Sequence, residues 1–258
     1  MDLERAKTIA VAAVKQSGRL LMDNLEKVKA VSFKGKRDIV TEIDFQPEKI
    51  IVSSILKNFP GHKILSEEKG TSGGSSKYLW IIDPIDGTIN YYHASAPFRI
   101  GLCLLESHTP ILSVIYNPVK DQLFLAEKGR GATLNGQKIK TSDNQELKNA
   151  IVLTHLSSKK GARIRTIAAL EKIFEKTMHL RIFGCGLAAM TYVATGKFDI
   201  YFNVKTYSWD ILPGALLVSE AKGKVTDIQG NEISNRSTSV LATNGKIHDQ
   251  MLKLLKNI

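Results

Sequence analysis

The chain has 258 residues, of which 43% are hydrophobic and 24% are charged; this composition excludes a disordered or fibrous protein and allows one large domain or two small ones. Its apolar runs fall far short of the roughly 20 residues of a membrane helix, and no signal-peptide core is seen at the N-terminus, so we expect a cytoplasmic protein without a membrane partner. The net charge of +11 indicates an anionic partner, but the bases are dispersed, which favours a solvated lysine-rich surface over a nucleic-acid interface.

The first part of the chain predicts two helices with a surface strand or hairpin arm between them. Apolar residues recur at spacings of three and four over residues 1–27, which predicts an amphipathic helix packed on a core. The weak alternation over residues 31–40 favours a surface strand or hairpin arm. Asp44 precedes a second predicted helix, because Pro47 suits a first helical turn and Pro60 ends the apolar stripe.

Strands follow, separated by turn residues. Residues 70–76 are rich in Gly and Ser and predict a mobile surface loop. An apolar strand is expected over residues 78–82, ending at Asp83. Three further apolar segments with turns between them predict an antiparallel meander at residues 98–106, 110–116 and 122–126. This half is therefore expected to hold helices against a sheet.

From about residue 145 strands and helices alternate, which predicts an α/β half. The expected strands are residues 151–154, 179–183, 198–202, 224–227 and 240–242, and the expected helices are residues 162–176, 187–195, 210–221 and a last one from 247. The whole chain is predicted to be α+β, with subdomains 1–145 and 146–258 in one compact unit. Cys103 and Cys185 lie in apolar or Gly-rich stretches and are expected to be reduced.

The segment Asp83-Pro-Ile-Asp-Gly-Thr88 carries the clearest chemical signal. Its two carboxylates follow a predicted buried strand, and a bend at Pro84 would turn both of them, with the carbonyl of Ile85, toward one point. Such hard oxygen ligands suit Mg²⁺ or Mn²⁺. Gly87 and Thr88 would present backbone N–H groups to a phosphate, so a cation site and an anion site are predicted side by side.

Simpler interpretations compete with this site. Asp-Pro and Asp-Gly are common turn pairs, Glu67 and Glu68 alone would be a solvated loop pair, and Asp210 beside Trp209 could be only a helix N-cap. The chain is short of acids, yet acidic residues stand at the ends of several predicted elements. These residues are Asp44, Glu67, Asp83, Asp86 and Asp210. Together they favour a metal site.

Three ordered motifs resemble the inositol monophosphatase family of metal-dependent sugar-phosphate phosphatases. The motifs are Ser66-Glu-Glu68, Trp80-Ile-Ile followed by Asp83-Pro-Ile-Asp-Gly-Thr88, and Trp209-Asp210 with Leu217-Val-Ser-Glu-Ala-Lys-Gly223. The resemblance runs from about Asp38 to Asp227, and three motifs in order are far more specific than one. It implies a layered α-β-α-β-α sandwich and a homodimer.

The resemblance also implies the metal ligands. Glu67, Asp83 and the Ile85 carbonyl would hold one Mg²⁺, and Asp83 would bridge to a second ion held by Asp86 and Asp210. Two or three Mg²⁺ ions are implied in all, Mn²⁺ can substitute, and Li⁺ is expected to inhibit. Paired ions would supply the charge neutralisation that phosphate ester hydrolysis needs, so no histidine base is required.

Further roles follow from the same resemblance. Asp44, the last residue of Asp38-Ile-Val-Thr-Glu-Ile-Asp44, would orient the attacking water together with Thr88, and Glu67 counts as catalytic as well as a ligand. The amides of Gly87 and Thr88 would bind the phosphate.

The substrate is less sharply defined. Asn203 stands where several inositol-selective members carry Glu, which argues against strict inositol specificity. Lys205 and Arg181 could meet a second phosphate, as in members that also hydrolyse fructose 1,6-bisphosphate, or both could be exposed surface bases. We therefore predict a Mg²⁺-dependent phosphatase for a small phosphorylated sugar or inositol, acting on inositol monophosphate, fructose 1,6-bisphosphate or both. The alternatives are a phosphatase for 3′-phosphoadenosine 5′-phosphate and an inactive basic nucleic-acid-binding relative; we expect no nucleic-acid partner.

Overall fold

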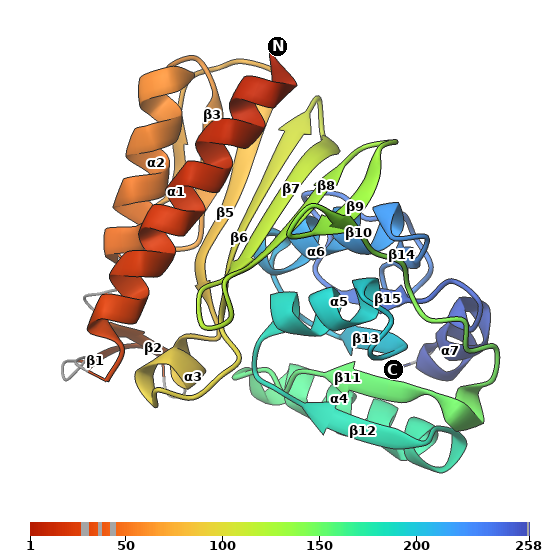
Figure 1. The fold of residues 1–258 in the computed structure, drawn as a ribbon. Coiled ribbons are helices and arrows are strands. Elements are labelled where there is room, and N and C mark those ends of the chain that lie inside the picture. The colour runs from red at the N-terminus through yellow and green to blue at the C-terminus, as the bar shows by residue number, and fades with distance from the viewer. Residues whose placement is uncertain (27–30, 36–37, 42–44, 257) are drawn as a thin grey trace.

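The computed structural model describes residues 1–26, 31–35, 38–41, 45–256 and 258. Helices α1 and α2 cover the outer face of a large sheet, α5 and α6 lie between it and a second sheet, and α4 and α7 cover the second sheet's outer face (Figure 1). The helices are α1 Leu3–Asn24, α2 Phe45–Asn58, α3 Thr88–Tyr92, α4 Lys160–Ile173, α5 Gly186–Ala194, α6 Ser208–Glu220 and α7 His248–Leu255, with short 3-10 turns η1 Leu147–Asn149 and η2 Phe174–Lys176. This layering confirms the predicted α+β class and the α-β-α-β-α sandwich.

The larger sheet has eight strands in the order β10-β9-β8-β7-β6-β5-β3-β4. Its strands are β3 Lys63–Ser66, β4 Gly70–Gly73, β5 Tyr78–Asp86, β6 Arg99–Glu106, β7 Thr109–Asn117, β8 Gln122–Glu127, β9 Gly131–Leu134 and β10 Gln137–Lys138. All neighbours are antiparallel except β3 and β5. The predicted meander is confirmed as β6, β7 and β8, and strands β1 Val31–Gly35 and β2 Asp38–Thr41 form the expected hairpin.

Two sequence-based predictions in this sheet are wrong. The Gly-rich segment is not only a loop, because Gly70–Gly73 pairs with β3 as the edge strand β4. Gly73 has φ +90 and its Cβ position would lie 2.3 Å from the carbonyl oxygen of His62, so glycine here permits the pairing. Strand β5 also continues past Asp83 to Asp86, since Pro84 falls at a bulge where its missing N–H breaks no regular ladder.

The second sheet has the order β12-β11-β13-β15-β14, with β11, β12 and β13 parallel. Its strands are β11 Ile151–Thr154, β12 His179–Ile182, β13 Ile200–Asn203, β14 Lys224–Thr226 and β15 Val240–Thr243. Parallel strands end at the same sheet edge, so the segments after β11, β12 and β13 come together there. All five strands were expected from the sequence.

Helix α6 packs closely on helix α5 and on the larger sheet. Gly214 of α6 packs on Met190 of α5, where a Cβ would lie 2.3 Å from the Met190 Cε. Pro213 lies inside α6, and its carbonyl accepts a hydrogen bond of 2.7 Å from Ser113 Oγ of β7. These contacts hold the second turn of α6, which follows the turn that carries Asp210, against α5 and the larger sheet.

Two further expectations are tested by the described residues. Cys103 and Cys185 are both free and buried, as predicted. Within the described ranges, every helix is too short or too polar to cross a bilayer.

Candidate metal centre

The end of strand β5 carries two aspartates at a bulge. Asp83 pairs with Gly101 of β6 and Asp86 with Arg99, so three steps on β5 oppose two on β6 and the strand bends at Pro84. The backbone N–H of Ile85 donates to Asp83 Oδ1 at 3.1 Å. The bend that the sequence suggested at Pro84 is present.

Asp210 comes from the first turn of α6, in the layer between the sheets. Its Oδ2 accepts hydrogen bonds from Thr206 Oγ1 at 2.5 Å and from the backbone N–H of Tyr207 at 3.0 Å. Tyr207 is the N-cap of α6, so Asp210 is not the N-cap that the simpler interpretation suggested; as the third helical residue it accepts the N–H of Tyr207 in a capping box, which fixes the direction of its carboxylate.

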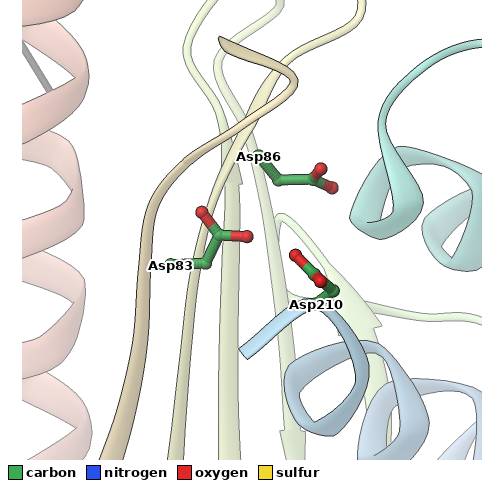
Figure 2. A group of neighbouring side chains, drawn as sticks. All are labelled: Asp83, Asp86 and Asp210. Atoms are coloured by element: carbon green, nitrogen blue, oxygen red, sulfur yellow. The ribbon is translucent and has the colours of Figure 1, made fainter. Parts of the chain in front are cut away.

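The three aspartates converge. Carboxylate oxygens of Asp83, Asp86 and Asp210 lie within 4.8 Å of one another, and Figure 2 shows the three groups facing a common space. Glu67, in the turn between β3 and β4, lines the adjoining cavity, and its charge acts on Asp83. The structure therefore brings Glu67, Asp83, Asp86 and Asp210 together.

The buried carboxylates of this cluster repel one another, and a cation would stabilise them. Burial, followed by the charges of Glu67, Asp86 and Asp210, raises the pKa of Asp83 well above its usual value. Burial and the charge of Asp210 raise the pKa of Asp86 to about 6. Asp83 is 0% exposed, and its Oδ2 has no hydrogen-bond partner in the part of the chain that the structure describes. A hard divalent cation would satisfy this oxygen and remove the repulsion, so the residues present fit Mg²⁺.

The turn after β5 adds a hydroxyl and amides to the centre. Thr88 Oγ1 donates to the carbonyl oxygen of Ile85 at 3.1 Å. Gly87 precedes α3 with φ +93, and its Cβ position would lie 3.0 Å from the Pro97 carbonyl oxygen and 3.2 Å from the Cβ of Cys185. Only glycine fits this position without displacing a neighbour.

A cavity of about 320 Å³ opens from the acidic cluster. Its lining includes Glu67, Asp86, Asp210 and the Ile85–Thr88 turn. Segments that follow the parallel strands of the second sheet also line it. These segments contribute His155, Ser157 and Ser158 after β11, Gly184 after β12 and Lys205 after β13, and Arg163 of α4 joins them.

The structure separates the predicted substrate residues. Asn203 and Lys205 line the cavity, and the amide N–H of Lys205 donates to Asn203 Oδ1 at 3.1 Å. Arg181 is not among the lining residues; it is exposed and its guanidinium donates to the carbonyl of Leu180 at 2.8 Å. Arg181 lies on β12 beside Ile182, which does line the cavity, and the exposure of Arg181 agrees with the alternative interpretation as a surface base.

Sequence reasoning missed several lining residues. The side chain of Arg163 is half-buried at the cavity, and its Nε donates to the Ser157 carbonyl at 3.2 Å. His155 and Tyr207 also line it. The signal that could have found them is the expected strand at residues 151–154, since residues that follow parallel strands form the crevice of an α/β sheet. Asp44 lies outside the described residues, so its catalytic role stays a prediction.

Comparison with known proteins shows the family of this chain. The model of the inositol monophosphatase family matches residues 2–258. The chain is 35% identical over 251 residues to a Thermotoga maritima protein named fructose-1,6-bisphosphatase/inositol-1-monophosphatase, with 96% of this chain and 95% of that protein covered. It is 32% identical over 254 residues to the Nus factor SuhB of Salmonella typhimurium, covering 97% and 95% of the two chains. A solved structure of the extragenic suppressor protein suhB from Bartonella henselae superposes with a TM-score of 0.92 at 30% identity, covering 98% of this chain and 99% of that one.

Proposed function

The chain belongs to the inositol monophosphatase family and is a phosphatase, and we propose that it hydrolyses the phosphate esters of small polyols, inositol monophosphate and fructose 1,6-bisphosphate. The observation that carries this proposal is the convergence of Asp83, Asp86 and Asp210 within 4.8 Å at one end of a cavity. The family is metal-dependent. Two or three Mg²⁺ ions, replaceable by Mn²⁺, and inhibition by Li⁺ are part of the proposal, as is a cytoplasmic location.

Each group of the centre has a part in the proposed reaction. Glu67, Asp83, Asp86, Asp210 and the Ile85 carbonyl would hold the ions. Bound Mg²⁺ neutralises charge that develops on the phosphoryl oxygens and acidifies water.

The chain's own residues would align the water and the phosphate. Thr88 donates its hydroxyl proton to the Ile85 carbonyl, which leaves the lone pairs of Oγ1 to accept a proton of the attacking water. Asp44 would accept the other proton. The amides of Gly87 and Thr88 would bind the phosphate oxygens, because the sharp turn at Gly87 opens the cavity wall at this point.

A phosphate-release assay on both substrates tests the proposal. We expect release from at least one of them with Mg²⁺, complete loss with a chelator, and recovery when Mg²⁺ is restored. Release from 3′-phosphoadenosine 5′-phosphate alone would support the alternative substrate instead. No release from any of the three would reject the proposal.

Two basic residues of the cavity favour a substrate with a second anionic group. Lys205 and Arg163 line the same cavity as the acidic residues, and Arg163 Nε donates to the Ser157 carbonyl. A charge-assisted hydrogen bond contributes about 1.5 to 3 kcal/mol. Fructose 1,6-bisphosphate carries such a second anion and inositol monophosphate does not.

Lys205→Ala and Arg163→Ala are therefore expected to raise the KM for fructose 1,6-bisphosphate about tenfold or more, and to change the KM for inositol monophosphate much less. Steady-state kinetics with both substrates measure this. Arg181→Ala is the matched control and should leave both KM values unchanged. A larger effect of Arg181→Ala than of Lys205→Ala would indicate that Arg181, rather than Lys205 and Arg163, meets the second phosphate.

A homodimer is proposed through one exposed apolar face. The face is formed by α4, η2 and the edge strand β12, and its exposed side chains are Ile164, Ile167, Phe174, Met178 and Ile182, each between 47% and 58% exposed. Ile182 also lines the cavity, so the face reaches the cavity rim. Exposed apolar side chains are frequent at protein interfaces, and β12 is an edge strand of the second sheet in the part of the chain that the structure describes, so that a second copy of the chain could pair with it.

Phe174→Asp is expected to convert the dimer into a monomer, because a carboxylate would be buried without a partner at the interface. Light scattering after size exclusion measures the mass. Val119→Asp is the control, since Val119 is 40% exposed between β7 and β8, away from this face. A monomeric wild-type protein would reject the dimer, and a Phe174→Asp dimer would reject this face.

A second candidate function comes from the SuhB relatives. The relative named Nus factor SuhB and the chain's net charge of +11 favour a test for RNA binding. A mobility shift of random RNA that weakens steeply with salt would support it. Absence of any shift would uphold the prediction that there is no nucleic-acid partner.

A further inference from the structure

The start of helix α5 holds the carboxylate of Asp86 by two hydrogen bonds. The Sγ of Cys185 donates to Asp86 Oδ2 at 3.1 Å, and the backbone N–H of Leu187 donates to the same oxygen. Cys185 is the residue that caps α5, it is 3% exposed, and its Sγ also lies 3.4 Å from the Asp86 carbonyl oxygen. In Figure 2 the Asp86 carboxylate points toward the teal ribbon of α5.

The same arrangement recurs at the other aspartates of the centre. Asp210 Oδ2 is held by the hydroxyl of Thr206 and the amide of Tyr207, as Asp86 Oδ2 is held by a thiol and an amide. At Asp83 the amide of Ile85 holds Oδ1. These hydrogen bonds thus hold each carboxylate by one of its two oxygens. The donors are on Oδ1 of Asp83 and on Oδ2 of Asp86 and Asp210.

Asp83 gives an independent indication of what occupies the space between the three carboxylates. Asp83 is fully buried, and its Oδ2 finds no hydrogen-bond partner within the described ranges. This oxygen belongs to the cluster whose three carboxylates face one space, so a cation is the natural occupant of that space. The orientation of Asp86 then decides whether its second oxygen reaches the cation.

We propose that Cys185 is a positioning residue, whose thiol holds the Asp86 carboxylate in the orientation that binds Mg²⁺, as the Thr206 hydroxyl does for Asp210. The inference rests on the proposed metal site. Cys185 does not line the cavity and touches neither cation nor substrate; it acts through Asp86. Outer partners of this kind change metal affinity because they remove the cost of orienting the ligand when the cation binds.

Substitutions at Cys185 separate hydrogen bonding from packing. Cys185→Ser keeps a donor, whereas Cys185→Ala and Cys185→Val remove it. Valine fills the space of the thiol, and the extended backbone of Cys185, with φ −146 and ψ 108, suits a β-branched residue. Should Cys185→Ala not fold, Cys185→Val carries the same test. Cys103→Ala is the matched control, because Cys103 is equally buried in the β6 core.

Calorimetric titration of MgCl₂ into the metal-free protein is the measurement, with thermal unfolding in a chelator as the check on folding. We expect Cys185→Ala and Cys185→Val to weaken Mg²⁺ binding about tenfold or more, and Cys185→Ser and Cys103→Ala to stay within about twofold of the wild type. Wild-type affinity in folded Cys185→Val, or equal losses in Cys185→Val and Cys185→Ser, would overturn the inference. If the wild-type protein itself bound no Mg²⁺, the proposed metal site would fail first.

Discussion

The Asp210→Asn variant is expected to release phosphate at least about 10³-fold more slowly than the wild type, a larger loss than removal of one preorganised donor usually causes. A neutral amide cannot replace the carboxylate as a cation ligand beside Asp83 and Asp86. The asparagine oxygen can still accept the hydrogen bonds from Thr206 and Tyr207 that cap α6. The loss should therefore appear in kcat at saturating Mg²⁺ and substrate, measured by phosphate release.

The metal-free stability of the same variant provides the second half of this test. The charge of Asp210 raises the pKa of both Asp83 and Asp86, so its removal relieves repulsion when no cation is bound. We expect Asp210→Asn to unfold in a chelator at the same temperature as the wild type or higher. Asp143→Asn is the control, because Asp143 is an exposed partner of Lys140 and Lys246 outside the cavity and should keep full turnover. Turnover of Asp210→Asn within about tenfold of the wild type, with unchanged Mg²⁺ dependence, would contradict the ligand role.

The local part of the site could be predicted from the sequence. Asp83, Ile85, Asp86, Gly87 and Thr88 are consecutive or nearly so, and a proline after a buried strand confines them to one bend whatever the rest of the fold does. Asp210 was also identified, but its approach to Asp83 depends on the packing of α6 between the sheets. The position of acidic residues at the ends of predicted elements and the motif resemblance suggested that approach, although no spacing in the sequence encodes it.

The basic residues of the cavity could not be predicted in the same way. Which bases face the substrate depends on the strand order β12-β11-β13 and on where each parallel strand ends. One or two residues of error in the end of β12 decide whether Arg181 or the following loop lines the cavity. The contact between Cys185 and Asp86 joins two layers of the sandwich, and it becomes visible only when those layers are in place. The division into subdomains at residue 145 stays a prediction.

Mg²⁺ is expected to stabilise the folded protein strongly at pH 7.5 and much less at pH 5. A ligand at 100 times its Kd adds about 2.7 kcal/mol to the free energy of unfolding, or roughly 5 to 10 °C for a chain of this size. At pH 7.5 Asp86 is ionised, because its pKa is raised only to about 6, so cation binding relieves its repulsion with Asp210. At pH 5 protonation of Asp86 already relieves part of this repulsion, because the pKa of Asp86 is raised to about 6.

The sign of the pH effect follows from linkage. The folded metal-free protein binds a proton at Asp86 more tightly than the unfolded chain does, so this proton stabilises the fold below about pH 6 and the stabilisation is lost as the pH rises through that value. His248 acts in the opposite direction, since its burial between Thr226 and Thr243 lowers its pKa to about 4 and favours unfolding as the pH falls below about 6.5.

The His248 contribution is the same with and without the cation. The shift in unfolding temperature between MgCl₂ and a chelator at matched ionic strength therefore isolates the acidic cluster. We expect this shift to be largest in the wild type at pH 7.5, reduced at pH 5, and small at both pH values in Asp210→Asn. An equal Mg²⁺ shift at both pH values, or none at pH 7.5, would show that Asp83, Asp86 and Asp210 do not form the cation site.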